Sequence, residues 1–299
     1  MLNVLRSELT RLRRPRILLT WFALMSAFAV MINMVMFSTV TSGSAPAGGG
    51  PGVTFPDSAE LATSHGLVVG LSSAASMFGV VVLSFWAIST ATDYSTGLIR
   101  LLASAQPSRW RLLMGKVIAL VMVTAAASAV ATVVNVMVAP VAAQSAGVRP
   151  ETWVNNPVPT VLSAYVHLFA AMCVWGAFGL ALAVALRSSA VAISIGIGYV
   201  LVFESIVRMA SSAPPTWLLG TTLSALANGG TAQVSMTSAV AAGLTYALAG
   251  LALARGEAVA VKHPAAPHFV APDGHVHRFD VLAGGPPCAV DAVGFVGGL

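Results

Sequence analysis

Six long apolar runs constrain this chain more than any other feature of its sequence. They cover residues 17–40, 66–90, 112–143, 160–186, 190–210 and 234–254. About 20 consecutive apolar residues are enough for a helix to cross the hydrocarbon core of a bilayer. Inside that core only helices and closed barrels satisfy their own backbone hydrogen bonds. The sequence therefore predicts an all-α integral membrane protein with six transmembrane helices.

The composition excludes a water-soluble globular domain. Of the 299 residues, 57% are hydrophobic and 8% are charged, whereas soluble domains carry about a quarter charged residues. The formal net charge of +5 does not indicate nucleic-acid binding, because the basic residues cluster at the ends of the apolar runs. Thirteen arginines against two lysines, with much Ala and Val, are typical of a GC-rich bacterial genome. Cys173 and Cys288 form no disulfide framework or metal-ligand spacing.

The only sizeable polar and basic segment between two apolar runs extends over residues 93–116. An apolar stripe at helical spacing is formed there by Leu98, Leu101, Leu102 and Ala105. This spacing predicts a short amphipathic helix over about residues 93–106. Pro107 stands where a second helix would start, because proline fits the first helical turn. We expect the amphipathic helix to lie along the inner membrane face and to dock to another protein.

The same segment resembles the cytoplasmic loop of type-2 ATP-binding-cassette (ABC) permeases. The shared pattern is an acidic residue followed by x-x-x-Gly, a leucine-rich turn, Pro-Ser-Arg at 107–109 and Gly-Lys at 115–116. The acidic residue here is Asp, where the family more often has Glu. In that family the segment is the coupling helix that receives the nucleotide-binding subunit. The resemblance therefore implies ATPase docking by Asp93, Gly97, Leu98, Arg100, Leu101, Leu102, Pro107 and Arg109.

The resemblance implies the transmembrane subunit of an ATP-driven exporter of unidentified substrate. The chain has no G-x-x-x-x-G-K-[ST] phosphate loop, so ATP and Mg²⁺ are expected on a separate cytoplasmic ATPase subunit. The chain itself would be no enzyme and hold no cofactor. The family assembles as a dimer of permeases, so we expect a second copy of this chain or a similar permease, with the substrate path at their interface.

Two other classes of function stay open. An ATP-independent secondary transporter or channel would be expected to contain internal repeats or several intramembrane charges. A membrane-embedded enzyme would need His, Asp or Glu clustered at one depth, and a scaffold without transport would need neither feature. The sequence has no clear repeat and no such cluster. The exporter is therefore the favoured hypothesis.

Three polar residues inside the apolar runs are candidates for a gate or a substrate path. Asn135 lies in the third run, where an interhelical hydrogen bond is the more ordinary role. Glu204 and Arg208 are four residues apart near the end of the fifth run, so they can neutralise one another. The pair could anchor the helix structurally or serve a gate or substrate path, and both roles stay open. Gly66, Gly70 and Ala74 form a row of small residues, which suits a contact within the bundle or in a dimer. The alternative is that glycine is simply common in membrane helices.

The remaining segments flank or interrupt a six-span permease domain over residues 17–255. Residues 1–16 predict a basic amphipathic helix in the membrane interface, and 211–233 predict an interfacial or re-entrant outer hairpin. Residues 256–299, rich in Pro, Gly, Ala and His, predict a disordered tail without standard metal-ligand spacing.

The distribution of basic residues predicts the orientation of the chain in the membrane. Thirteen basic residues fall on the predicted inner side, and only Arg149 and Arg208 fall on the outer side. Loops rich in Lys and Arg stay in the cytoplasm. We therefore expect a multi-pass protein of the cell membrane, in contact with membrane lipids, with both termini cytoplasmic.

Overall fold

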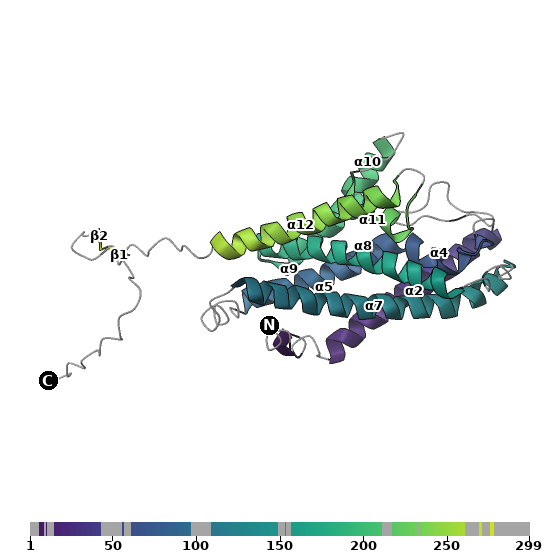
Figure 1. The fold of residues 1–299 in the computed structure, drawn as a ribbon, viewed down its shortest axis with the longest axis horizontal. Helices are drawn as coiled ribbons and strands as arrows, with labels where there is room; N and C mark the ends of the chain where they lie inside the picture. The colour runs from purple at the N-terminus through teal and green to yellow at the C-terminus, as the bar shows by residue number, and fades with distance from the viewer. Residues whose placement is uncertain are drawn as a thin grey trace, which may run out of the picture. The chain divides into compact units, whose positions relative to one another are not determined.

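The fold is almost entirely helical (Figure 1). The computed structural model describes residues 6–8, 10, 15–42, 56, 61–96, 109–148, 153, 157–210, 217–231, 234–260, 269–270 and 276–277. Among these residues, six helical stretches are long and apolar enough to cross a membrane: Arg16–Val40, Ala75–Tyr94, Leu112–Ser145, Pro157–Leu186, Ser189–Val207 and Met236–Leu253. The prediction of an almost entirely helical chain with six helices long and apolar enough to cross a membrane is confirmed.

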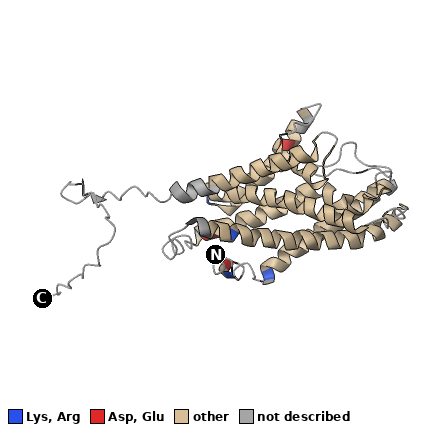
Figure 2. Cartoon of the chain, viewed as in Figure 1, with Lys and Arg blue, Asp and Glu red and all other residues tan. Residues whose placement is uncertain are grey.

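The helices follow the predicted apolar runs closely. Their bounds are α2 Pro15–Ser42, α4 Gly66–Ser73, α5 Ala75–Ser95, α7 Arg109–Ser145, α8 Pro157–Leu186, α9 Ser189–Ile197, the π-helix Gly198–Phe203, α10 Glu204–Ala210, α11 Leu219–Ala227 and α12 Met236–Ala260. Both α2 and α8 begin at a proline, whose missing N–H would have no partner in the first turn anyway. Figure 2 shows long stretches of these helices free of charged residues.

The second apolar run forms two helices where the sequence predicts one. Between α4 and α5, Ala74 has a ψ of 2°, far from the roughly −42° of an α-helix. Every residue of α4 except Ser72 is buried. Since eight residues are too few to cross a bilayer, the spanning helix of this run starts at Ala75.

The fifth apolar run also departs from a plain α-helix. It changes to a π-helix at Gly198 and returns to an α-helix at Glu204. A π-helical turn holds more residues than an α-helical turn. The insertion therefore rotates the following residues to a new face, which helical periodicity in the sequence does not predict.

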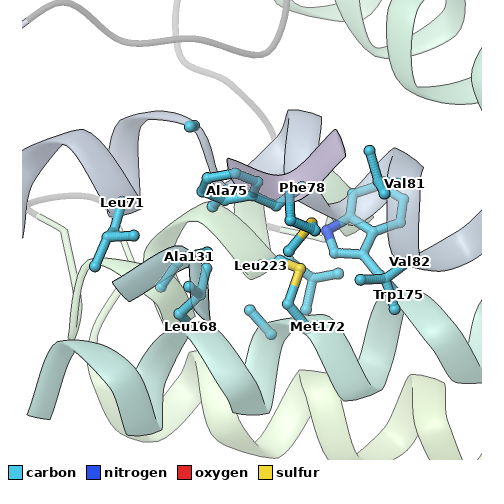
Figure 3. Close-up of a cluster of buried hydrophobic side chains, with 14 of the residues drawn as sticks. Leu71, Ala75, Phe78, Val81, Val82, Ala131, Leu168, Met172, Trp175 and Leu223 are labelled. Atoms are coloured by element: carbon cyan, nitrogen blue, oxygen red, sulfur yellow. The ribbon is translucent and has the colours of Figure 1, made fainter. Parts of the chain in front are cut away.

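The α5 and α8 helices pack closely at the centre of the bundle through two tryptophan–glycine contacts. The ring of Trp175 on α8 covers Gly79 on α5, and the ring of Trp86 on α5 covers Gly176 on α8. A Cβ atom at either glycine would lie 2.4 Å from the facing ring. Both tryptophans are fully buried, and Figure 3 shows Trp175 beside α5 residues of the buried apolar cluster.

The predicted small-residue row packs inside this chain. A Cβ atom at Gly70 would lie 2.7 Å from Oδ1 of Asn135, and one at Gly66 would lie 2.0 Å from the carbonyl oxygen of Leu61. Ala74 is also fully buried. The row therefore serves close contact within the bundle.

Helix ends follow the turn residues of the sequence. Gly229, with φ of +73°, ends α11, and Gly230 donates its N–H to the carbonyl of Ala225 at 2.8 Å. This is the Schellman arrangement, which favours glycine because the backbone is left-handed there. At the turn between α8 and α9, Ser188 is the N-cap and its hydroxyl accepts from the Val191 N–H.

Two predicted terminal segments lie largely outside the described residues. Of the predicted interfacial helix, residues 6–8 and 10 are described and helical. Of the predicted tail, strands β1 (Phe269–Val270) and β2 (Val276–His277) are described, and they pair antiparallel.

We expect Gly176→Ala to destabilise the bundle. The added methyl would collide with the rigid Trp86 ring, and overpacking of this kind costs about 1–3 kcal/mol. The apparent melting temperature in detergent, followed by size-exclusion chromatography, should fall. Gly243→Ala is the matched control, because its Cβ would meet its nearest neighbour at an ordinary 3.4 Å. Equal melting temperatures for both variants would contradict the close α5–α8 contact.

Candidate functional site

An ion pair joins the two ends of the polar segment between the second and third spans. Asp93 lies in the last turn of α5, and Lys116 lies near the start of α7. Lys116 Nζ donates to the Asp93 carboxylate and, at 2.8 Å, to the carbonyl of Ser89 one turn earlier. Asp93 and Lys116 are only 6% and 7% exposed. Buried charges are tolerated when they are paired, so this pair fixes the end of α5 against α7.

Most of the predicted docking residues lie outside the described part of the chain. These are Gly97, Leu98, Arg100, Leu101, Leu102 and Pro107. Arg109 begins α7, but its side chain is not among those described. The Asp93–Lys116 pair lies close to where the chain leaves α5 and enters α7. Both residues belong to the motif, but their contact was not predicted.

A second polar contact joins α2, α4 and α7. Asn33 Nδ2 donates to Asn135 Oδ1, and Asn135 Nδ2 donates to the carbonyl of Leu67, both at 2.8 Å. Both asparagines are buried. The interhelical hydrogen bond expected of Asn135 is therefore present, and its partner Asn33 was overlooked. The available signal was a lone amide in the otherwise apolar first run.

A third contact connects the fifth span to α11. Glu204 is fully buried, and its Oε1 accepts the backbone N–H of Gly220 at 2.6 Å. Gly220 is the second residue of α11, whose N-cap residue, Leu218, makes no side-chain cap hydrogen bond. The first N–H groups of a helix lack intrahelical partners and favour a negative charge. Glu204 therefore caps α11 from a separate helix.

This contact places the Glu204 carboxylate directly against Gly220, so a side chain at position 220 would displace it. A Cβ atom there would lie 2.1 Å from Oε2 of Glu204. The predicted partner of Glu204, Arg208, has a side chain outside those described. The backbone partner of Glu204 was not predicted, because every residue except proline has a backbone N–H.

Two tyrosine hydroxyls form hydrogen bonds at the same end of α11. The Tyr199 hydroxyl accepts from the Leu219 N–H at 3.3 Å. Tyr246 on α12 donates its hydroxyl to the carbonyl of Trp217. The start of α11 is thus held by side chains from both the fifth and the sixth spans.

The arrangement consists of structural polar contacts among membrane helices. Among the described residues, no group of three or more His, Cys, Asp or Glu side chains is placed to hold a metal ion.

Comparison with known proteins gives the family of the chain. A family model described as "Protein of unknown function (DUF2705)" matches residues 26–253, about three quarters of the 299 residues. The chain belongs to this family. The matched region contains the Asp93–Lys116 pair, the two asparagines and the Glu204–Gly220 contact. No curated protein matches the chain.

We expect single substitutions in the Asp93–Lys116 pair to be more harmful than the double substitution. Asp93→Asn leaves a buried lysine charge and Lys116→Met leaves a buried carboxylate, each a loss of about 3–5 kcal/mol. Asp93→Asn with Lys116→Met removes both charges and should recover most of the stability. Melting temperatures of the three variants measure this. If the two single effects simply add in the double variant, the side chains do not interact.

Proposed function

We propose that this chain is the transmembrane subunit of an ATP-driven ABC exporter. In this proposal a separate cytoplasmic ATPase subunit binds ATP and Mg²⁺ and docks on the segment after Asp93. Closure of the ATPase subunits moves the coupling helices, and the spans follow. The chain would act in the cell membrane as a homodimer or with a similar permease.

The observation that carries the proposal is the Asp93–Lys116 ion pair. Its two residues are the first and last of the motif that resembles the coupling loop of type-2 ABC permeases. A docked subunit can move the spans only if the loop is joined firmly to them. A buried ion pair between α5 and α7, with Lys116 also bound to the Ser89 carbonyl, provides such a junction.

The proposed topology places this end of the bundle in the cytoplasm. Arg16 begins the first span, Asp93 and Lys116 lie at the ends of the second and third spans that face their shared loop, and Arg187 follows the fourth. Because successive spans run in opposite directions, these residues share one side of the membrane. Basic residues mark the cytoplasmic side, so both termini of the chain are assigned there.

Two further parts of the proposed architecture have partial support. The helical residues 6–8 fit an N-terminal interfacial helix. The nine-residue α11 is too short to span the bilayer, and Leu219, Leu223 and Leu226 are buried. A short buried helix between two spans suits a re-entrant segment better than one lying on the membrane surface.

Affinity purification of the tagged chain from its native membranes in mild detergent tests the function. Mass spectrometry of the co-purified proteins should reveal a stoichiometric subunit that carries a phosphate loop. Repeated recovery of the chain alone, at good yield, would instead favour the ATP-independent transporter or channel.

We expect Leu101→Asp to abolish recovery of that ATPase subunit. The substitution places a charge on the apolar stripe of the predicted coupling helix, whereas Ser104→Asp places the same charge off the stripe and serves as the control. A bulky residue at Gly97 should act like Leu101→Asp. All variants should still insert and elute as monodisperse protein. Full ATPase recovery with Leu101→Asp would refute the docking assignment.

A further inference from the structure

The second half of the fifth span is only lightly attached to the bundle. Its side chains Val202, Phe203 and Ile206 are 57%, 45% and 60% exposed. In Figure 1, α10 projects away from the other helices. The first half differs, because α9 packs on both α5 and α8. Glu204, the first residue of α10, is fully buried although Phe203 and Ile206 are exposed.

The π-helix Gly198–Phe203 separates these two halves. A π-helical turn interrupts the regular hydrogen-bond ladder and is a recognised site of helix bending. Side-chain crowding is also low at its start, because a Cβ atom at Gly198 would meet nothing within 4 Å. The fifth span therefore has a bending point directly before Glu204.

The helix that Glu204 contacts, α11, is by contrast packed closely against the core. Leu223 and Leu226 of α11 are 0% and 3% exposed, and α11 packs against α4, α5 and α8. Ser224 faces Ser76 of α5 with 3.4 Å between their hydroxyl oxygens. The contact between Glu204 and Gly220 thus joins a lightly packed segment to a fixed one.

We propose that α10 is a hinged segment, with the π-helix Gly198–Phe203 as its hinge and the Glu204–Gly220 contact as its closure. Breaking that contact lets α10 swing away from α11. The swing opens the start of α11, with Tyr199 and Tyr246, laterally to the bilayer. This inference goes beyond the proposed exporter function, because no step of it requires an ATPase subunit.

Electron–electron distance measurements on the full chain in lipid nanodiscs test the hinge. One spin label replaces Ile206 on α10, and the other replaces Val158 at the start of α8, which is 73% exposed. The fifth span runs antiparallel to α8, so the two labels lie at the same end of the bundle. Cys173 and Cys288 are replaced by Ala to leave only the labelled cysteines.

Two substitutions break the contact from opposite sides. Glu204→Met removes the acceptor while filling the volume. Gly220→Ala leaves Glu204 and Arg208 unchanged in the sequence. The new Cβ would lie 2.1 Å from Oε2 of Glu204, so it displaces the carboxylate from the backbone N–H of residue 220. Thr245→Val is the control, because the exposed Thr245 hydroxyl donates to the Ala241 carbonyl within α12 and lies away from the Glu204–Gly220 contact.

We expect a single short-distance population in the parent and in Thr245→Val. Gly220→Ala and Glu204→Met should each add a second population at longer distance, and Glu204→Gln, which keeps an acceptor without the charge, should give a smaller one. Distance distributions for Gly220→Ala that superimpose on the parent would overturn the proposal. If Glu204→Met does not yield monodisperse protein, Gly220→Ala alone decides the outcome.

Discussion

The rest of the bundle depends on the close approach of α5 and α8. Between membrane helices there is little hydrophobic driving force, so association relies on packing and on small residues that let backbones meet. Here each helix offers a glycine to a tryptophan of the other, Gly79 to Trp175 and Gly176 to Trp86. The indole N–H of Trp86 also donates to Thr124 Oγ1 at 2.9 Å, which ties α7 to the same pair. The more peripheral helices then pack on this centre.

The spanning helices could be predicted from the sequence because length and apolarity decide them. The fourth run, predicted over 160–186, is observed as Pro157–Leu186. The two internal changes of helix type could not be predicted. The break at Ala74 and the π-helix at Gly198 occur within smooth apolar sequence. Both serve tertiary contacts, since α4 presents the Leu67 carbonyl to Asn135 and the π-helix precedes Glu204.

The polar residues of the site were visible in the sequence, whereas their partners mostly were not. Asn135 was expected to bond another helix, and the lone amide of the first run made Asn33 a candidate partner without fixing the pairing. For Glu204, helical spacing favoured Arg208, while the described partner is a backbone N–H that every non-proline residue possesses. The Asp93–Lys116 pair had the clearest signal, because two adjacent spans bring the ends of their shared loop together.

The interhelical contacts of this chain differ in how readily they can break and form again. The tryptophan–glycine contacts between α5 and α8 cannot open without separating two buried helices along their length. A single interhelical hydrogen bond in a membrane contributes on average about 0.6 kcal/mol, up to about 1.7 kcal/mol, and a charged acceptor strengthens it further. A difference of about 1.4 kcal/mol changes an equilibrium tenfold. A segment joined to the bundle by such a bond, as α10 is through Glu204, can therefore open and close while the α5–α8 centre stays fixed.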